Sequence, residues 1–82
     1  MRWRVVYFDD IPDQIECLQD VLVDQFDISG THDVMQFEKY LETNPHLILL
    51  DVHMPVMNGY ELYAKIQNSP YYNGCPILFI SG

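Results

Sequence analysis

Three short runs of apolar residues stand out along the chain, and none of them alternates with polar residues. They are Val5 to Phe8, Leu47 to Leu50 and Ile77 to Ile80. Unbroken apolar runs of this length are typical of strands in a parallel sheet whose two faces are both covered. A further segment, Phe26 to Asp33, is partly polar, and it predicts an edge strand that ends at Gly30.

Between these runs the apolar positions recur every three or four residues, which is the spacing of an amphipathic helix. The three predicted helices run from Pro12 to Phe26, from Val34 to a stop at Asn44-Pro45, and from Asn58 to a stop before Ser69-Pro70. Asn58 precedes Glu61 by three residues, as a helix cap precedes its third helical residue. Strands and helices alternate, which predicts an α/β fold with an open parallel sheet and right-handed crossovers.

Length and charge narrow the class of protein. The 82 residues suffice for one small domain, and 12 acidic against 4 basic side chains give a net charge of -8. This charge repels nucleic-acid phosphates and anionic membrane surfaces, so we expect no direct nucleic-acid binding and no membrane association. No apolar run reaches the roughly 20 residues of a membrane span, and the first residues do not form a signal peptide. We therefore expect a cytoplasmic protein.

Acids and a hydroxyl follow the apolar runs. Asp9 and Asp10 follow the first, Asp51 follows Leu47 to Leu50, and Ser81 follows the last. Parallel strands point the same way, so these side chains gather at one rim, where open α/β sheets bind ligands. Clustered carboxylates repel one another, and a hard divalent cation, Mg²⁺ or Mn²⁺, relieves that repulsion. The alternative for Asp10 is the commoner role of capping the helix that follows.

These motifs resemble the receiver domain of two-component response regulators. The resemblance covers the whole chain and rests on the acidic pair Asp9-Asp10, on LILLDVHMPVMNG around Asp51, and on CPILFISG with Ser81 and Gly82. It implies a flavodoxin-like, receiver-like sheet of strand order 2-1-3-4. It also implies phosphorelay signal transduction, with a sensor histidine kinase or a phosphotransfer protein as partner.

The resemblance assigns a role to each matching residue. Asp51 matches the phosphoacceptor, whose carboxylate attacks a phosphoryl group and becomes an aspartyl phosphate. Asp10, Asp51 and the backbone carbonyl of His53 match the direct Mg²⁺ ligands, and Asp9 matches an acid that holds the metal through water. Ser81 matches the switch hydroxyl that bonds the phosphoryl oxygen.

The loop after Asp51 is similar to that of the family as well. Pro55 and Gly59 match the residues that shape it, the first through a fixed φ and the second through a permissive backbone. We interpret the His53 side chain as one that tunes the lifetime of the acyl phosphate and not as a general base.

The chain departs from the family pattern at its C-terminal end. A receiver would continue through a fourth helix, a fifth strand with a phosphate-binding lysine, and a fifth helix, so we expect residues 1 to 82 to form one incomplete receiver-like domain. None of the basic residues replaces that lysine, and we expect impaired phosphoryl transfer. They are Arg2, Arg4, Lys39 and Lys65. The strand Ile77 to Ile80 becomes an exposed edge, which predicts self-association, in a dimer for example.

Two other functions stay open. One is a receiver remnant that is never phosphorylated and acts as a protein-interaction or dimerisation module. The other is a Mg²⁺-dependent phosphohydrolase with Asp51 as nucleophile. We disfavour it, and expect a protein that is not an enzyme, because His53 replaces the second acid that such enzymes place two residues after the nucleophile.

Overall fold

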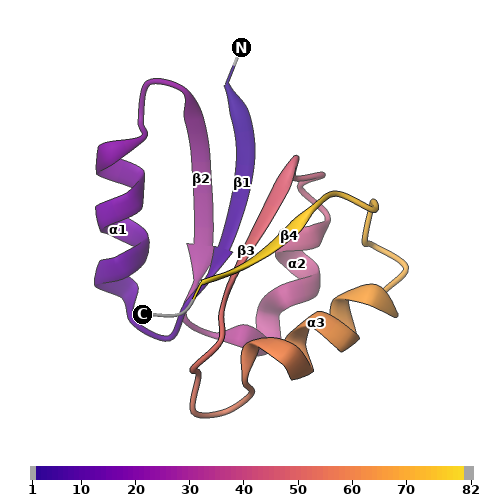
Figure 1. The fold of residues 1–82 in the computed structure, drawn as a ribbon. Helices are drawn as coiled ribbons and strands as arrows, with labels where there is room; N and C mark the ends of the chain where they lie inside the picture. Colours follow the sequence, from indigo (N-terminus) through magenta and orange to yellow (C-terminus); the bar gives the residue numbers. More distant parts are fainter. Residues whose placement is uncertain (1, 81–82) are drawn as a thin grey trace.

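The structure, a computed structural model, describes residues 2–80 and shows an α/β fold (Figure 1). Ser81, the predicted switch hydroxyl, and Gly82 lie outside the described residues. The elements in chain order are β1 (Trp3–Phe8), α1 (Pro12–Val21), β2 (Phe26–Thr31), a 3₁₀ turn (Val34–Gln36), α2 (Phe37–Leu41), β3 (Leu47–Asp51), α3 (Gly59–Gln67) and β4 (Ile77–Ile80). No helix in this part of the chain is both long enough and apolar enough to cross a membrane.

The strands form one parallel sheet in the order β2-β1-β3-β4, so the predicted order 2-1-3-4 is confirmed. Val5 of β1 pairs with Ile28 of β2 on one side and with Leu47 of β3 on the other. At the opposite end of β3, Asp51 pairs with Ile80 of β4. All four strands therefore end at the same rim, at the bottom of the sheet in Figure 1.

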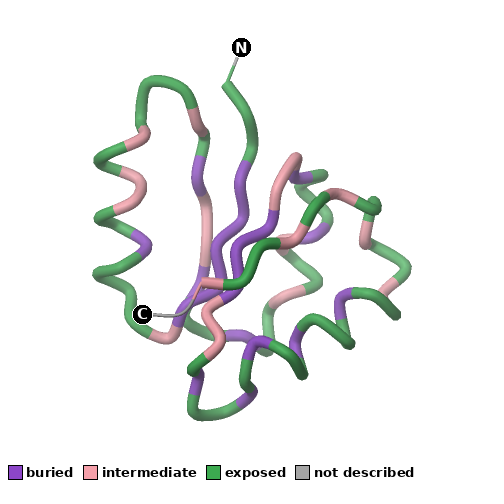
Figure 2. Tube along the Cα trace, viewed as in Figure 1, coloured by how far each residue is buried: buried purple, intermediate pink, exposed green. Residues whose placement is uncertain are grey.

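Two clusters of buried side chains pack on the two faces of the sheet. The cluster beneath α2 and α3 includes Phe8, Leu41, Ile48, Leu50, Leu62 and Ile66. The cluster beneath α1 contains Val5, Tyr7, Ile15, Ile28 and Leu49. Figure 2 shows buried positions concentrated on the central strands and the outer sides of the helices exposed. The unbroken apolar runs follow from this arrangement, because β1 and β3 contribute side chains to both clusters.

Two predicted boundaries are wrong. Helix α1 ends at Val21 and not at Phe26, because Phe26 already pairs with Trp3 as the first residue of β2. Leu22 and Phe26 continue the apolar spacing because both pack against the cluster beneath α1, although the turn between them is not helical. Strand β2 also extends one residue past the predicted end at Gly30.

The start of α3 is as predicted. The Asn58 side chain accepts a hydrogen bond from the backbone N–H of Glu61 at 2.9 Å, and the Glu61 carboxylate accepts one from the N–H of Asn58 at 3.4 Å. This reciprocal pair satisfies two of the free N–H groups at a helix start. It fixes the direction in which the chain leaves the loop that follows Asp51.

Candidate functional site

Three carboxylates meet where β1 and β3 end. Asp51 is the last residue of β3, and Asp9 and Asp10 directly follow β1. Each of the three offers a carboxylate oxygen, and these oxygens all lie within 4.8 Å of one another. The predicted gathering of these acids at one rim is therefore present in the structure, and the sheet order produces it by placing β1 beside β3.

Asp9 is the most buried of the three acids, with 4% of its surface exposed. Its Oδ1 accepts a hydrogen bond from the backbone N–H of Ile11 at 2.9 Å, and its Oδ2 accepts one from the Tyr7 hydroxyl at 2.6 Å. Each oxygen of this buried carboxylate thus has a donor, as a buried charge requires.

Asp10 differs from its neighbour. Its Oδ1 is buried and has no hydrogen-bond partner among the described residues. The helix-capping alternative for Asp10 is wrong, because Ile11 occupies the cap position of α1 without a side-chain cap and Asp9 accepts its N–H. An orphaned buried oxygen costs about 1–3 kcal/mol, and more when it is charged. Three carboxylates with one orphaned oxygen fit a hard divalent cation, which takes oxygen ligands only.

Asp51 lies half-buried beside these acids, and its Oδ1 accepts a hydrogen bond from the backbone N–H of His53 at 3.1 Å. An open pocket of about 280 Å³ lies in front of the carboxylates. It is lined by Tyr7, Asp9, Asp10, Ile11, Gln14, Asp51, His53 and Ile80. No lysine or arginine is among these described lining residues, so the pocket carries a negative field.

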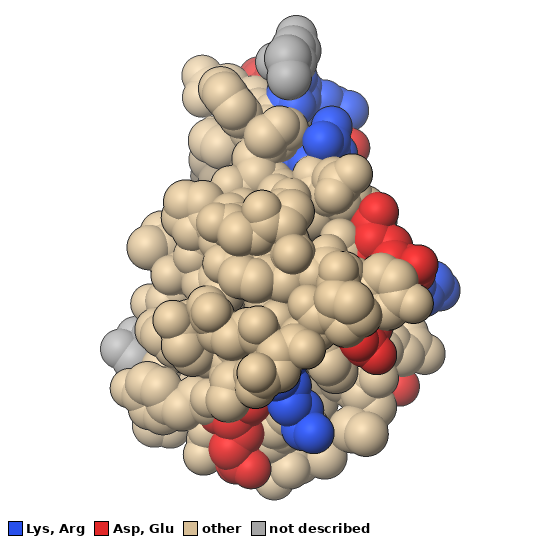
Figure 3. Space-filling view, turned by 90° about the vertical axis from the view of Figure 1, so that its right-hand side faces the viewer, with Lys and Arg blue, Asp and Glu red and all other residues tan. Residues whose placement is uncertain are grey.

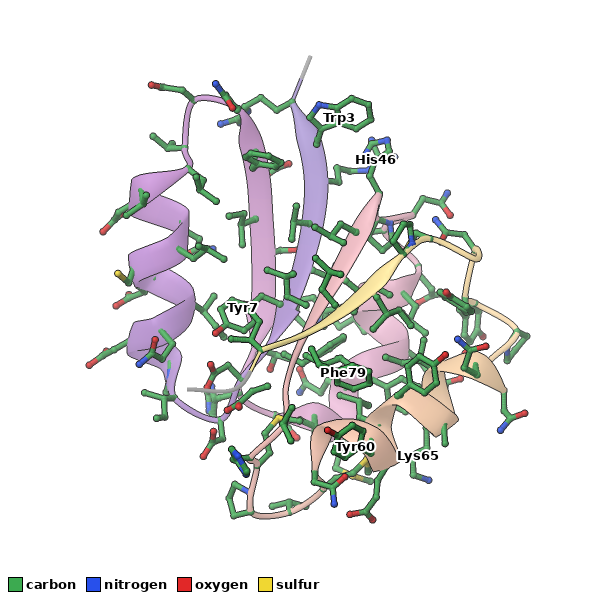
Figure 4. All side chains as sticks on the ribbon, viewed as in Figure 1. Trp3, Tyr7, His46, Tyr60, Lys65 and Phe79 are labelled. Atoms are coloured by element: carbon green, nitrogen blue, oxygen red, sulfur yellow. The ribbon has the colours of Figure 1, made fainter. Side chains whose placement is uncertain are left out.

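The basic side chains lie elsewhere. Arg2 donates a hydrogen bond to the carbonyl of Val23, and Arg4 donates two to the carbonyl of Asn44, at the end of the sheet remote from the acids. Lys39 belongs to α2. Figure 4 shows Lys65 on α3, on the side of the molecule away from Tyr7.

Tyr7 is a site residue that the sequence prediction missed. We interpreted it only as part of an apolar strand, yet its hydroxyl reaches Asp9. Burial raises the pKa of this hydroxyl well above its ordinary value, and the hydrogen bond to Asp9 and the charges of Asp9 and Asp51 raise it further. The signal was present in the sequence, since residues two apart in a strand face the same side.

Gly59 holds the loop to the end of β3, but not through the permissive backbone conformation that the sequence predicted. Among the described glycines, Gly74 and not Gly59 has a positive φ. A Cβ added at Gly59 would lie 2.6 Å from the carbonyl oxygen of Asp51 and 3.1 Å from the Cα of Val52. The position therefore requires glycine because of close backbone approach. Pro55 is exposed in the same loop and lines a shallow hollow beside Asp10.

Asp10→Asn is expected to stabilise the metal-free protein by about 1–2 kcal/mol at neutral pH, because it removes one of three repelling charges and the cost of an orphaned charged oxygen. Urea unfolding in a chelator at low salt measures this gain. We also expect Mg²⁺ to stabilise the unmodified chain, and Asp10→Asn to lose most of that stabilisation.

Asp27→Asn is the matched control for this charge change, since Asp27 is exposed and lies opposite Arg4 in the register of β2 and β1, at the end of the sheet remote from the acids. Its effect should stay within about 0.5 kcal/mol. A loss of stability in metal-free Asp10→Asn would contradict the repulsion argument.

Comparisons with known proteins agree on one family. The model of the response regulator receiver domain matches residues 5–82. Protein RcaC of Microchaete diplosiphon is 32% identical over 80 residues, which are 95% of this chain and 12% of that protein. A probable cyclic di-GMP phosphodiesterase of Vibrio cholerae is 30% identical over 79 residues, which are 95% of this chain and 18% of that protein.

Solved structures share the fold. A chemotaxis response regulator of Vibrio cholerae, CheY4, superimposes with a TM-score of 0.83 at 25% identity, covering 96% of this chain and 68% of that one. A sensor protein from Polaromonas sp. JS666 superimposes with a TM-score of 0.85 at 21% identity, over all of this chain and 67% of that one. The chain thus spans about two thirds of these solved structures and under a fifth of the two curated relatives.

Proposed function

The chain belongs to the response regulator receiver family, and on that premise we propose that it accepts a phosphoryl group on Asp51. The predicted receiver-like fold is shown by the strand order and by the solved structures that it matches. Receiver domains act in two-component signal transduction, where they interact with histidine kinases or phosphotransfer proteins. We propose such a protein as the donor to this chain.

The observation that carries the proposal is the position of Asp51 at the end of a buried strand, with Asp9 and Asp10 beside it. The His53 N–H holds Oδ1 of Asp51, and we assign the nucleophilic role to Oδ2. A bond forms between Oδ2 and the phosphorus while the bond from phosphorus to the histidine nitrogen of the donor breaks. The electron pair of the broken bond stays on that nitrogen. The ionised carboxylate has no proton to lose, so no general base is needed.

The residues present fit a divalent cation. Asp10, Asp51 and the backbone carbonyl of His53 would hold Mg²⁺ or Mn²⁺ directly, and Asp9 would hold it through water. When bound, the cation supplies the positive charge that lets a phosphoryl group approach three carboxylates. Asp9 stays fixed through its two hydrogen bonds and adds its charge to the site.

We expect the transfer to be slow, because no lysine or arginine among the described residues lines the pocket. A fixed positive side chain ordinarily stabilises the charge on the transferring phosphoryl oxygens. We keep Ser81 as the proposed switch hydroxyl, on the strength of its position in the family motif.

The proposal is tested by incubating the chain with Mg²⁺ and acetyl phosphate and measuring its intact mass over time. The expected result is the addition of one phosphoryl group, and omission of Mg²⁺ with added chelator should prevent it. No addition under any condition would favour the interaction module. Release of phosphate over many turnovers without accumulation on the chain would favour the phosphohydrolase.

A second candidate function, self-association, is favoured by the surface around β4. Leu78 is 54% exposed and Phe79 is 40% exposed. The Phe79 ring contacts Tyr60 and Tyr63 of α3, with ring centroids 5.0 and 5.5 Å apart. Figure 3 shows the side of the molecule with α3 and β4 as a broad uncharged area, with charged side chains mostly at its margins. Light scattering tests this candidate, and a monomer at all concentrations would contradict it.

A further inference from the structure

One buried polar contact in the acidic site fixes Asp9, and the proposed transfer does not account for its effect on the choice of metal ion. The Tyr7 hydroxyl donates to Oδ2 of Asp9 at 2.6 Å, and the two side chains are only 5% and 4% exposed. Tyr7 also lines the pocket that contains Asp51. A hydrogen bond this short from a neutral hydroxyl to a carboxylate is among the stronger kinds.

Tyr7 is distinctive among the donors to the three acids. The other donors recorded among the described residues are the backbone N–H groups of Ile11 and His53. These two are fixed by the path of the chain, whereas the Tyr7 hydroxyl is a side-chain group that a substitution can remove. Asp9 therefore has both oxygens engaged, while Asp10 keeps a buried oxygen without a partner.

We propose that Tyr7 is a positioning residue that holds Asp9 back from direct metal coordination and thereby favours Mg²⁺ over Ca²⁺. The inference rests on the metal site of the proposed function. Mg²⁺ keeps several waters and is bound through one or two carboxylates, whereas Ca²⁺ takes six to eight oxygens and gains from each further carboxylate. With Oδ2 engaged by Tyr7, the site offers two free carboxylates, from Asp10 and Asp51. Without the Tyr7 hydroxyl, Asp9 offers a third free carboxylate to the metal.

Tyr7→Phe tests the inference, because it removes the hydroxyl and keeps the buried ring. Isothermal titration of Mg²⁺ and Ca²⁺ into the same protein gives the two dissociation constants. We expect Ca²⁺ to bind about tenfold more tightly than to the unmodified chain and the affinity for Mg²⁺ to change by less than about threefold. The ratio of the two constants is informative, since a general loss of stability would weaken both.

Tyr72→Phe is a matched control. The Tyr72 hydroxyl also donates a hydrogen bond, but to the carbonyl of Cys75 and outside the acidic pocket. Its loss should leave the Ca²⁺ to Mg²⁺ ratio unchanged. An equal change of the ratio in both variants would overturn the inference.

A second background shows whether Tyr7 acts through Asp9. In Asp9→Asn, the further change Tyr7→Phe should not alter the ratio, because the carboxylate that it would release is gone. If the unmodified chain binds Mg²⁺ but Tyr7→Phe leaves the ratio of the Ca²⁺ and Mg²⁺ dissociation constants unchanged, the inference about Tyr7 is overturned and the proposed metal site stands. If the unmodified chain binds neither ion, the proposed metal site fails and the inference fails with it.

Discussion

Asp51→Asn is expected to abolish phosphorylation by acetyl phosphate completely, as measured by intact mass. The asparagine has nearly the same shape, and its Oδ1 can still accept the hydrogen bond that the His53 N–H gives to Asp51. Its amide nitrogen, however, is not a nucleophile toward phosphorus, and the negative charge is lost. The loss should therefore be chemical, with the fold intact.

Two variants make this result specific. Asp27→Asn removes the same charge at an exposed position remote from the acids and should be phosphorylated like the unmodified chain. His53→Ala should also accept one phosphoryl group, because the group that contacts Asp51 is the backbone N–H of residue 53 and not the imidazole. A phosphoryl group on Asp51→Asn would place the acceptor elsewhere and end the proposal for Asp51.

The fold was predictable from the sequence where burial and local hydrogen bonds decide the structure. The run Ile77 to Ile80 coincides with β4, and Asn58 with Glu61 identified the start of α3, because the capping pair needs no distant partner. The end of α1 was not predictable, since Leu22 and Phe26 are apolar to fill the cluster beneath α1 and their spacing alone does not distinguish a helix from a turn.

The candidate site was predictable to the extent that topology determines it. Residues that follow adjacent parallel strands must meet, which places Asp51 beside Asp9 and Asp10. The hydrogen bonds within the site were not predictable, because they depend on side-chain directions. The Tyr7 hydroxyl and the orphaned oxygen of Asp10 are the two examples, and both distinguish the roles of neighbouring acids.

Gly59→Ala is expected to destabilise the protein by about 3 kcal/mol, a large part of the roughly 4–12 kcal/mol expected for a domain of this length. The added Cβ would lie 2.6 Å from the carbonyl oxygen of Asp51. That oxygen belongs to the backbone of β3, so no side chain can rotate away to relieve the contact. Either α3 moves outward, which weakens the burial of Leu62 and Ile66, or the end of β3 moves with Asp51.

The sign of this effect is the sharpest part of the prediction. Gly59 is the first residue of α3, and in a helix interior the replacement of glycine by alanine ordinarily stabilises the helix by up to about 1 kcal/mol. Gly74→Ala provides the contrast, since Gly74 has a φ of +84° and open space around it, so its cost of about 1–2 kcal/mol comes from the backbone alone. Urea unfolding of the two variants measures both costs. Equal or greater stability of Gly59→Ala would show that α3 can leave the end of β3 freely, and Asp51 would then not be held rigidly by this loop.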